Sequence, residues 1–248
     1  MTETAVILAA GLGSRLKEYT REVPKSFMII DGETLIRRSI KKLLSAGIKR
    51  IIIGTGHCAD AFQEITSEYP EVSLIHSPRY KSTSSLYTLF NMRDRLDDSF
   101  LLLESDLLYE KRALTELLEH GAPDLVLGSD VTEYGDEVYL ETDRDNTLCG
   151  VSKQREDLSD GQVNSILVGI SKISAKGYQL ICRRYATIQK DRPKMDYEHM
   201  LAELHSSHPF RVLHSEKLEW CEIDNEEDLI RARKEVYPAI YKAEGDLE

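Results

Sequence analysis

The feature that most constrains the fold is an uninterrupted apolar run near the start of the chain, Ala5-Val-Ile-Leu-Ala-Ala10, which stops at a glycine. A strand with one face in water alternates apolar and polar residues, whereas a strand covered on both faces is apolar throughout. We therefore predict a buried parallel strand here. The run is far shorter than the roughly 20 residues of a membrane helix and lacks the basic flank of a signal peptide, so we expect no membrane partner.

Segments typical of helices and of strands alternate through the first half of the chain. The predicted helices are Thr34–Ala46, Ala59–Tyr69, a helix that opens at Ser82-Thr-Ser-Ser85 and carries Leu96, and Lys111–His120. The predicted strands are Arg50–Gly54, Val72–His76, Ser99–Leu103 and Asp124–Gly128. Because parallel neighbours need crossover connections, this order places helices on both faces of a sheet. The expected class is α/β, with a Rossmann-like, mostly parallel central sheet.

The pattern changes in the second half. Glu137–Thr142 and Leu148–Lys153 each alternate apolar and polar residues, with Asp145-Asn146 as turn residues between them, which predicts an inserted antiparallel hairpin. After the hairpin we predict a strand at Ile166–Ile173, helices near Ala175–Gln189 and Asp196–His205, a strand near Arg211–His214, and a last helix from Asn225 or Glu226. We interpret residues 1–248 as a single domain.

Composition and charge exclude several classes of function. Hydrophobic residues make up 41% of the chain and charged residues 30%, as is ordinary for a globular protein. The formal net charge of -11 argues against a nucleic-acid surface, although a basic pocket for a small anion stays open. The four cysteines form no C-x-x-C pair and match no zinc spacing. We therefore expect reduced thiols and a cytoplasmic location.

A glycine loop follows the first predicted strand, with Gly11 and Gly13 two residues apart. Glycines at the carboxyl end of a parallel strand let backbone N–H groups approach phosphates closely. A Rossmann dinucleotide site fits poorly, because the third glycine is missing and the next strand ends at Gly54-Thr-Gly56 without a ribose-binding acid. A Walker P-loop is excluded, since no Gly-Lys-Ser/Thr occurs.

Two cations follow this loop, Arg15 and, after Pro24, Lys25. Attack at the α-phosphorus of a nucleoside triphosphate builds negative charge on the equatorial and leaving oxygens. We predict that the planar fork of Arg15 holds the departing pyrophosphate and that Lys25 supplies a point charge nearer the α-phosphate, which makes both residues catalytic. The alternative interpretation makes both of them solvated surface cations.

Together, Leu8-Ala-Ala-Gly-Leu-Gly-Ser-Arg15 and Pro24-Lys25 resemble the signature of the nucleoside-triphosphate transferase family, which makes nucleotide-activated sugars and alcohols. The resemblance implies a nucleotide-binding half over about residues 1–128 and an acceptor- and metal-completing half over about 129–248. It implies these nucleotide-binding residues: Leu8, Ala9, Ala10, Gly11, Gly13 and Lys25. Lys17-Glu-Tyr-Thr20 and Ser26-Phe27 depart from the family pattern and weaken assignment to its hexose-1-phosphate branches.

Two aspartates match the family's metal ligands. Asp106 ends an apolar strand, and Asp224 closes the segment Trp220-Cys-Glu-Ile-Asp224 before a helix. Magnesium prefers one or two carboxylates together with phosphate and water oxygens, so we predict Mg²⁺ as the cofactor. The alternative is a strand-end cap for Asp106 and a helix N-cap for Asp224. Glu104 receives no role.

The base and the acceptor are predicted mainly from resemblance. Thr83, Ser84 and Ser85 precede a helix where small-alcohol cytidylyltransferases bind the base, and plain helix capping is the alternative. Leu103–Glu110, Gly135–Tyr139 and Leu167–Ile170 resemble 2-aminoethylphosphonate cytidylyltransferases, some of which are fused to an aminotransferase. Phosphocholine cytidylyltransferases are near relatives. The resemblance implies transfer of CMP from CTP to 2-aminoethylphosphonate. The alternatives are phosphocholine or a sugar-1-phosphate as the acceptor, and a non-catalytic nucleotide-binding module.

The chemistry of the acceptor's amine gives an independent indication. A primary ammonium needs carboxylate partners, whereas a quaternary ammonium prefers an aromatic cage. The predicted acceptor region contains the acids Asp130, Glu133, Asp136, Glu137 and Asp196, while Tyr134, Tyr139 and Tyr197 keep a cage possible. We predict a primary amine. Matched to the family, the acceptor site comprises Ser129, Asp136, Lys153, Lys172 and Asp196, with both lysines on the phosphonate.

Overall fold

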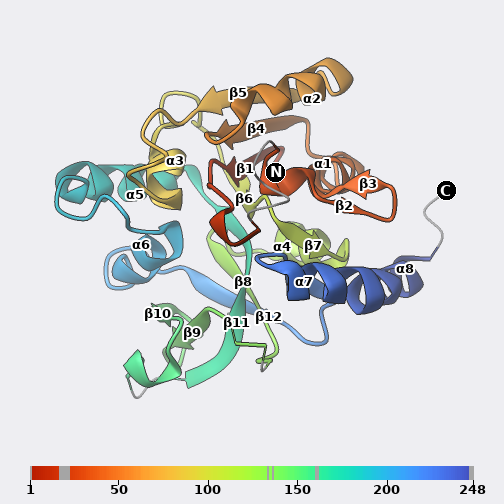
Figure 1. Cartoon of the computed structure of the whole chain (residues 1–248). Coiled ribbons are helices and arrows are strands. Elements are labelled where there is room, and N and C mark those ends of the chain that lie inside the picture. The colour runs from red at the N-terminus through yellow and green to blue at the C-terminus, as the bar shows by residue number, and fades with distance from the viewer. Residues whose placement is uncertain (1, 17–22, 133, 136, 160–161, 246–248) are drawn as a thin grey trace.

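A nine-stranded sheet forms the centre of the computed structural model, which describes residues 2–16, 23–132, 134–135, 137–159 and 162–245. The first strand, β1 (Thr4–Ala9), pairs in parallel with β4 (Arg50–Thr55) on one side and with β6 (Phe100–Glu104) on the other. A fourth parallel strand, β5 (Val72–His76), pairs with β4. The predicted buried strand is therefore confirmed, and it lies in the interior of the sheet (Figure 1).

The second half of the chain extends this sheet through one long strand. That strand, β11 (Gln162–Ile173), runs antiparallel to β6 and also to β8 (Leu125–Ser129). The strand β12 (Arg211–Ser215) pairs in parallel with β8. The predicted hairpin consists of β9 (Tyr139–Thr142) and β10 (Leu148–Ser152), which pair antiparallel, and β9 adds onto β11. The expected mostly parallel α/β sheet with a hairpin insertion is confirmed.

Helices cover both faces of the sheet, as the apolar character of β1 requires. One face packs against α1 (Leu35–Ser45), α2 (Gln63–Glu68) and α4 (Arg112–Glu119), and shares a core with Ala5 and Ile7. The opposite face packs against α3 (Ser85–Phe90), α5 (Ala175–Ile188) and α6 (Tyr197–Glu203), and shares a core with Val6 and Leu8. Because successive strand residues point to opposite faces, both cores need apolar residues along β1.

The C-terminal helices pack against an early part of the chain. After α7 (Glu226–Arg231) comes a π-helical segment, Ala232–Val236, and then α8 (Tyr237–Glu244). These helices share a third apolar cluster with residues such as Met28 and Leu35, close to a small hairpin of β2 (Ile29–Ile30) and β3 (Glu33–Thr34) (Figure 1). Among the helices that the structure describes, none has both the length and the apolar character needed to cross a bilayer.

Two sequence-based details differ from the structure. The helix that opens at Ser85 ends at Phe90, so Leu96 lies beyond it. The sequence also did not predict a two-stranded sheet of β7 (Leu107–Tyr109) and β13 (Trp220–Glu222), whose strands are short and far apart in the chain. In addition, the backbone N–H of Ile223 donates to the Asp106 carbonyl, 3.1 Å away. This small sheet brings the two predicted metal-binding segments together.

Candidate active site

The glycine loop opens onto free space at the carboxyl end of β1. Gly13 has φ 61°, a left-handed conformation that glycine adopts without steric cost. A Cβ added to Gly11 would meet no other atom within 4 Å, so the backbone here is accessible from the cavity side. Arg15 lies in a short 3₁₀ turn, Ser14–Leu16. The following segment Lys17-Glu-Tyr-Thr20 lies outside the described residues.

A cavity of about 770 Å³ lies beside this loop and contains most of the predicted site residues. Those that line it are Leu8, Ala10, Gly11, Arg15, Thr83, Ser84, Ser85, Asp106, Ser129, Lys153, Asp196 and Asp224. A second cavity of about 190 Å³ shares Gly11, Arg15 and both aspartates with the first, and adds Ala9, Gly13 and Lys25. The N-terminal loop and the C-terminal metal segment therefore border two adjacent cavities that share lining residues, an arrangement that suits a triphosphate.

Lys25, which lines the second cavity, is the central residue of an ion-pair network. Its ammonium donates to Asp106 over 2.6 Å, donates to Asp224 as well, and lies 3.8 Å from Glu222. Arg15 also pairs with Asp224. Burial alone would favour the neutral amine, but Asp106 and Asp224 raise the pKa of Lys25 above its usual value. In turn, Lys25 and Arg15 lower the pKa of Asp224 against the opposing effect of burial.

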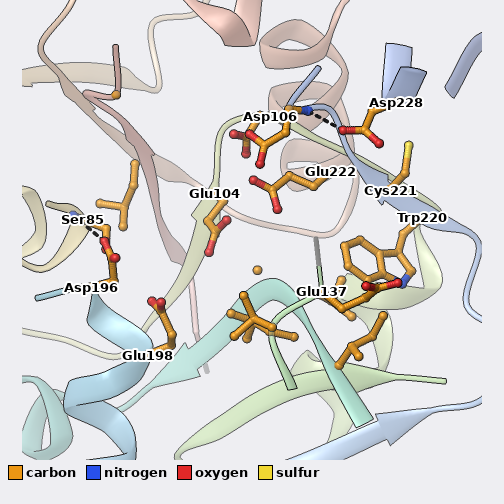
Figure 2. Close-up of a pocket in the computed structure, with 18 of the residues that line it drawn as sticks. Ser85, Glu104, Asp106, Glu137, Asp196, Glu198, Trp220, Cys221, Glu222 and Asp228 are labelled. Atoms are coloured by element: carbon orange, nitrogen blue, oxygen red, sulfur yellow. Dashed lines mark hydrogen bonds between the residues drawn. The ribbon is translucent and has the colours of Figure 1, made fainter. Parts of the chain in front are cut away.

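Three carboxylates form a compact cluster beside Lys25. Glu104, Asp106 and Glu222 each offer one oxygen within 4.8 Å of the others (Figure 2). Burial, assisted by Asp106 and Asp224, raises the pKa of Glu222 to about 8. The other oxygen of Asp106, Oδ1, is buried without a hydrogen-bond partner. An all-oxygen donor set with an unsatisfied buried oxygen suits a hard divalent cation.

The cluster differs from the predicted pair of metal ligands. Glu222 was not predicted and Glu104 had no assigned role, whereas Asp224 lies beside the cluster and is paired with Lys25 and Arg15. A signal for Glu222 was present in the sequence, because residues two apart in a strand share a face and Glu222 stands two before Asp224. Glu104 had no such local signal. Its carboxylate accepts from the Tyr197 hydroxyl at 3.0 Å, a contact between β6 and α6.

The predicted base-binding segment borders the same cavity but is also linked to α6. Ser85 donates through its hydroxyl to Asp196 over 2.9 Å and through its backbone N–H over 3.3 Å (Figure 2). The side chain of Ser84, the N-cap residue of α3, makes no capping hydrogen bond. The hydroxyl of Thr83 donates to the Arg79 carbonyl. A residue predicted for the nucleotide, Ser85, therefore contacts one predicted for the acceptor, Asp196.

The other predicted acceptor residues separate into two groups. Ser129 and Lys153 line the main cavity, where the Ser129 hydroxyl accepts from the Trp220 indole at 2.8 Å. Lys172 does not reach the cavity, which corrects the prediction. Its ammonium donates to the His120 carbonyl at 2.6 Å, because this part of β11 pairs with the start of β6, at the opposite edge of the sheet. Glu133 and Asp136 lie outside the part of the chain that the structure describes.

Comparison with known proteins identifies the family of this chain. Residues 5–148, more than half of the chain, match the family model of the MobA-like NTP transferase domain. The chain belongs to this family. The family is one of nucleotidyltransferases, and the predicted resemblance is confirmed. The matched span contains the glycine loop, Lys25 and Asp106, while Asp224 lies beyond it.

Several curated relatives of this transferase are cytidylyltransferases. Choline-phosphate cytidylyltransferase of Haemophilus influenzae is 34% identical over 98 residues, which are 40% of this chain and 42% of that protein. 2-Aminoethylphosphonate cytidylyltransferase of Lancefieldella rimae is 30% identical over 105 residues, 42% of this chain and 43% of that protein. The bifunctional IPC transferase and DIPP synthase of Aquifex aeolicus is 24% identical over 99% of this chain, and the match spans 54% of its length. The matches thus span about half of these relatives or less.

Solved structures support the fold over nearly the whole transferase. The inositol-1-phosphate CTP transferase of T. maritima superimposes with a TM-score of 0.80 at 19% identity, covering 100% of this chain and 98% of the other. The CTP:phosphocholine cytidylyltransferase of Streptococcus pneumoniae also gives 0.80, at 22% identity, covering 94% and 99%. At such identities these likenesses concern the fold alone.

Proposed function

We propose that this transferase moves CMP from CTP to 2-aminoethylphosphonate and releases pyrophosphate, with Mg²⁺ bound at the active site. The observation that carries the proposal is an ion-pair network beside an open glycine loop. Lys25 pairs with Asp106 of the carboxylate cluster, and both Lys25 and Arg15 pair with the neighbouring Asp224. Cations suit the phosphates of a nucleotide, and the carboxylates suit the cation that accompanies them.

Asp106 and Glu222, with Glu104 beside them, are the residues that would hold the metal. Asp224 lies beside this cluster and forms an ion pair with Lys25. A bound Mg²⁺ neutralises phosphate charge and so favours attack at phosphorus. Lys25 and Arg15, which pair with Asp106 and Asp224, are the cations that would face the phosphates.

The reaction needs no covalent intermediate with the protein. An oxygen of the phosphonate attacks the α-phosphorus and forms a new P–O bond, while the bond to the β-phosphate bridging oxygen breaks and its electron pair leaves with pyrophosphate. Lys25 would stabilise charge at the α-phosphate, Arg15 would hold the leaving group, and Lys153 would orient the phosphonate. Positioning and charge neutralisation are the main contributions available to the protein in such a transfer.

Side-chain contacts favour a primary amine on the acceptor over a quaternary one. Of the three tyrosines considered for an aromatic cage, Tyr134 has the guanidinium of Arg231 over its ring, 3.9 Å from the ring centre. Tyr197 is 1% exposed, and its hydroxyl is bonded to Glu104. Tyr139 does not line the cavity in the part of the chain described. These three tyrosines therefore do not form a cage for a trimethylammonium, and the carboxylates of the cavity wall favour a primary ammonium.

Phosphocholine is the second candidate acceptor, because a choline-phosphate cytidylyltransferase is among the relatives and Trp220 lines the cavity. We also expect a cytoplasmic location and fusion to an aminotransferase in a longer protein. We take residues 1–248 to form one domain.

Pyrophosphate release tests the proposed function. The purified protein with Mg²⁺ is assayed with CTP and either 2-aminoethylphosphonate or phosphocholine, and with UTP or dTTP and glucose-1-phosphate. We expect turnover with CTP and 2-aminoethylphosphonate, and little with the hexose phosphate. Preference for phosphocholine or for a sugar phosphate would overturn the acceptor. Absence of turnover with every amino-alcohol phosphate and phosphonate would favour a non-catalytic nucleotide-binding module.

A further inference from the structure

One carboxylate in the main cavity differs from its neighbours in burial. Glu198, in the first turn of α6, is 8% exposed and lines the cavity. Figure 2 shows its carboxylate directed from α6 into the space that Glu104 and Asp196 also face. Glu198 has no distinguishing signal in the sequence, because an acid in the first turn of a helix is ordinarily explained by the helix dipole.

Glu198 has spare hydrogen-bonding capacity. Its Oε1 lies 3.4 Å from Nδ1 of His199, an imidazole whose side chain is 45% exposed. Within the described ranges no hydrogen-bond or ion-pair partner is found for Oε2. An ionised carboxylate accepts several hydrogen bonds, and it is costly to bury when these are not made.

Other acids of the cavity wall are more exposed or already have partners. Asp130 accepts from the His214 imidazole at 3.0 Å and from the Lys217 backbone at 2.8 Å. Glu137 accepts from one hydroxyl and two backbone N–H groups of the neighbouring loop. Asp196 accepts twice from Ser85 through one oxygen, Oδ1, and is less buried than Glu198. Glu198 is therefore the buried acid with an oxygen left for a ligand.

The position of Glu198 also relates it to the reaction centre. Burial, Glu222, Asp106 and Glu198, in that order, raise the pKa of Glu104 well above its usual value. Glu198 is thus close enough to the metal-binding cluster for its charge to act there, but it is not a member of the cluster.

We propose that Glu198 determines acceptor specificity by receiving a hydrogen bond, through Oε2, from the primary ammonium of the acceptor. This inference rests on the proposed function, and it names the residue that distinguishes a cationic acceptor from a neutral one of the same size. A primary ammonium brings three N–H donors and a positive charge to this wall. A methyl group in its place leaves the buried carboxylate uncompensated.

The test compares two ligands that differ only in this group, 2-aminoethylphosphonate and n-propylphosphonate. Binding of each is measured by calorimetry on protein loaded with Mg²⁺ and a non-hydrolysable CTP analogue. We expect the wild type to bind the aminoethyl compound roughly 10- to 100-fold more tightly, as a charge-assisted hydrogen bond provides. Glu198→Gln should lose most of this preference and retain its affinity for the CTP analogue.

Glu203→Gln is the matched control on the same helix, since Glu203 pairs with Arg192 and does not line the cavity. It should leave the preference unchanged, and thermal melting of both variants checks folding. The inference is overturned if the wild type binds both ligands equally, if Glu198→Gln keeps the preference, or if Asp196→Asn removes it instead. A wild type that binds with this preference but does not turn over would refute the proposed function and leave the inference standing.

Discussion

Replacement of Lys25 by methionine should destabilise the protein in a way that Mg²⁺ reverses. The side chains of Lys25, Asp106 and Asp224 are 12%, 16% and 9% exposed, so the ion pairs are largely buried. Breaking a buried pair by removing one partner costs about 3–5 kcal/mol. Because Arg15 still pairs with Asp224, we expect the lower end, about 3 kcal/mol. For a protein of this size that lowers Tm by roughly 6–12 °C.

Mg²⁺ should partly replace the lost positive charge, because one of its proposed ligands, Asp106, is a partner of Lys25 and another, Glu222, lies 3.8 Å from the ammonium. In thermal melts, Mg²⁺ should therefore raise the Tm of Lys25→Met more than that of the wild type, even though turnover falls by roughly 10²- to 10³-fold. Lys42→Met is the control. Lys42 forms a comparably buried pair with Glu244, with side chains 13% and 12% exposed, outside both cavities of the site.

The control should lose stability to a similar degree, show no extra response to Mg²⁺ and keep its turnover. The reasoning is refuted if Lys25→Met melts with the wild type in the absence of metal. It is equally refuted if Mg²⁺ raises the Tm of Lys25→Met and Lys42→Met by the same amount, because the ion would then act elsewhere.

Two further predictions concern single side chains of the site. Asp106→Asn should lower turnover by at least about 10²-fold while circular dichroism shows an unchanged fold, because the amide supplies a weaker metal ligand in an almost unchanged shape; an active variant would remove Asp106 from the mechanism. Lys153→Met should raise KM for the acceptor about 10-fold with little effect on KM for CTP. Lys172→Met should leave both KM values unchanged and lower Tm, because Lys172 donates to a backbone carbonyl away from the cavity. Equal kinetic effects of the two lysine variants would contradict this placement.

Local pattern was enough to predict much of the fold. The apolar run Ala5–Ala10 predicted a strand covered on both faces, and helices do cover both sides of β1. Thr34 accepts from the Arg37 backbone as the N-cap of α1, whose residues Ile36, Ile40 and Leu43 are buried. Such features depend on residues a few positions apart, where periodicity and capping act. Leu96 was misplaced because the same spacing persists beyond the real end of α3.

Long-range pairing was beyond these patterns, and it decided the composition of the site. Lys172 has the residue type expected for an anion site, yet the antiparallel direction of β11 places it beside Leu101, near the start of β6. Three residues along β6, at its other end, Glu104 joins the metal-binding cluster. The spacing of residues along the sequence does not specify which end of a strand a residue of the neighbouring strand will lie beside.

By itself, the sequence determined the class of sheet, the glycine loop at the end of β1, and the types of charge that follow it, because short-range chemistry specifies each of these. The tertiary structure decided which charges meet. Pairing of β7 with β13 brings Asp106 and Glu222 together across more than a hundred residues, and packing of α6 against β6 sets Glu198 beside the cluster. Those contacts depend on strand order and helix packing, which fix distances between residues that are remote along the chain.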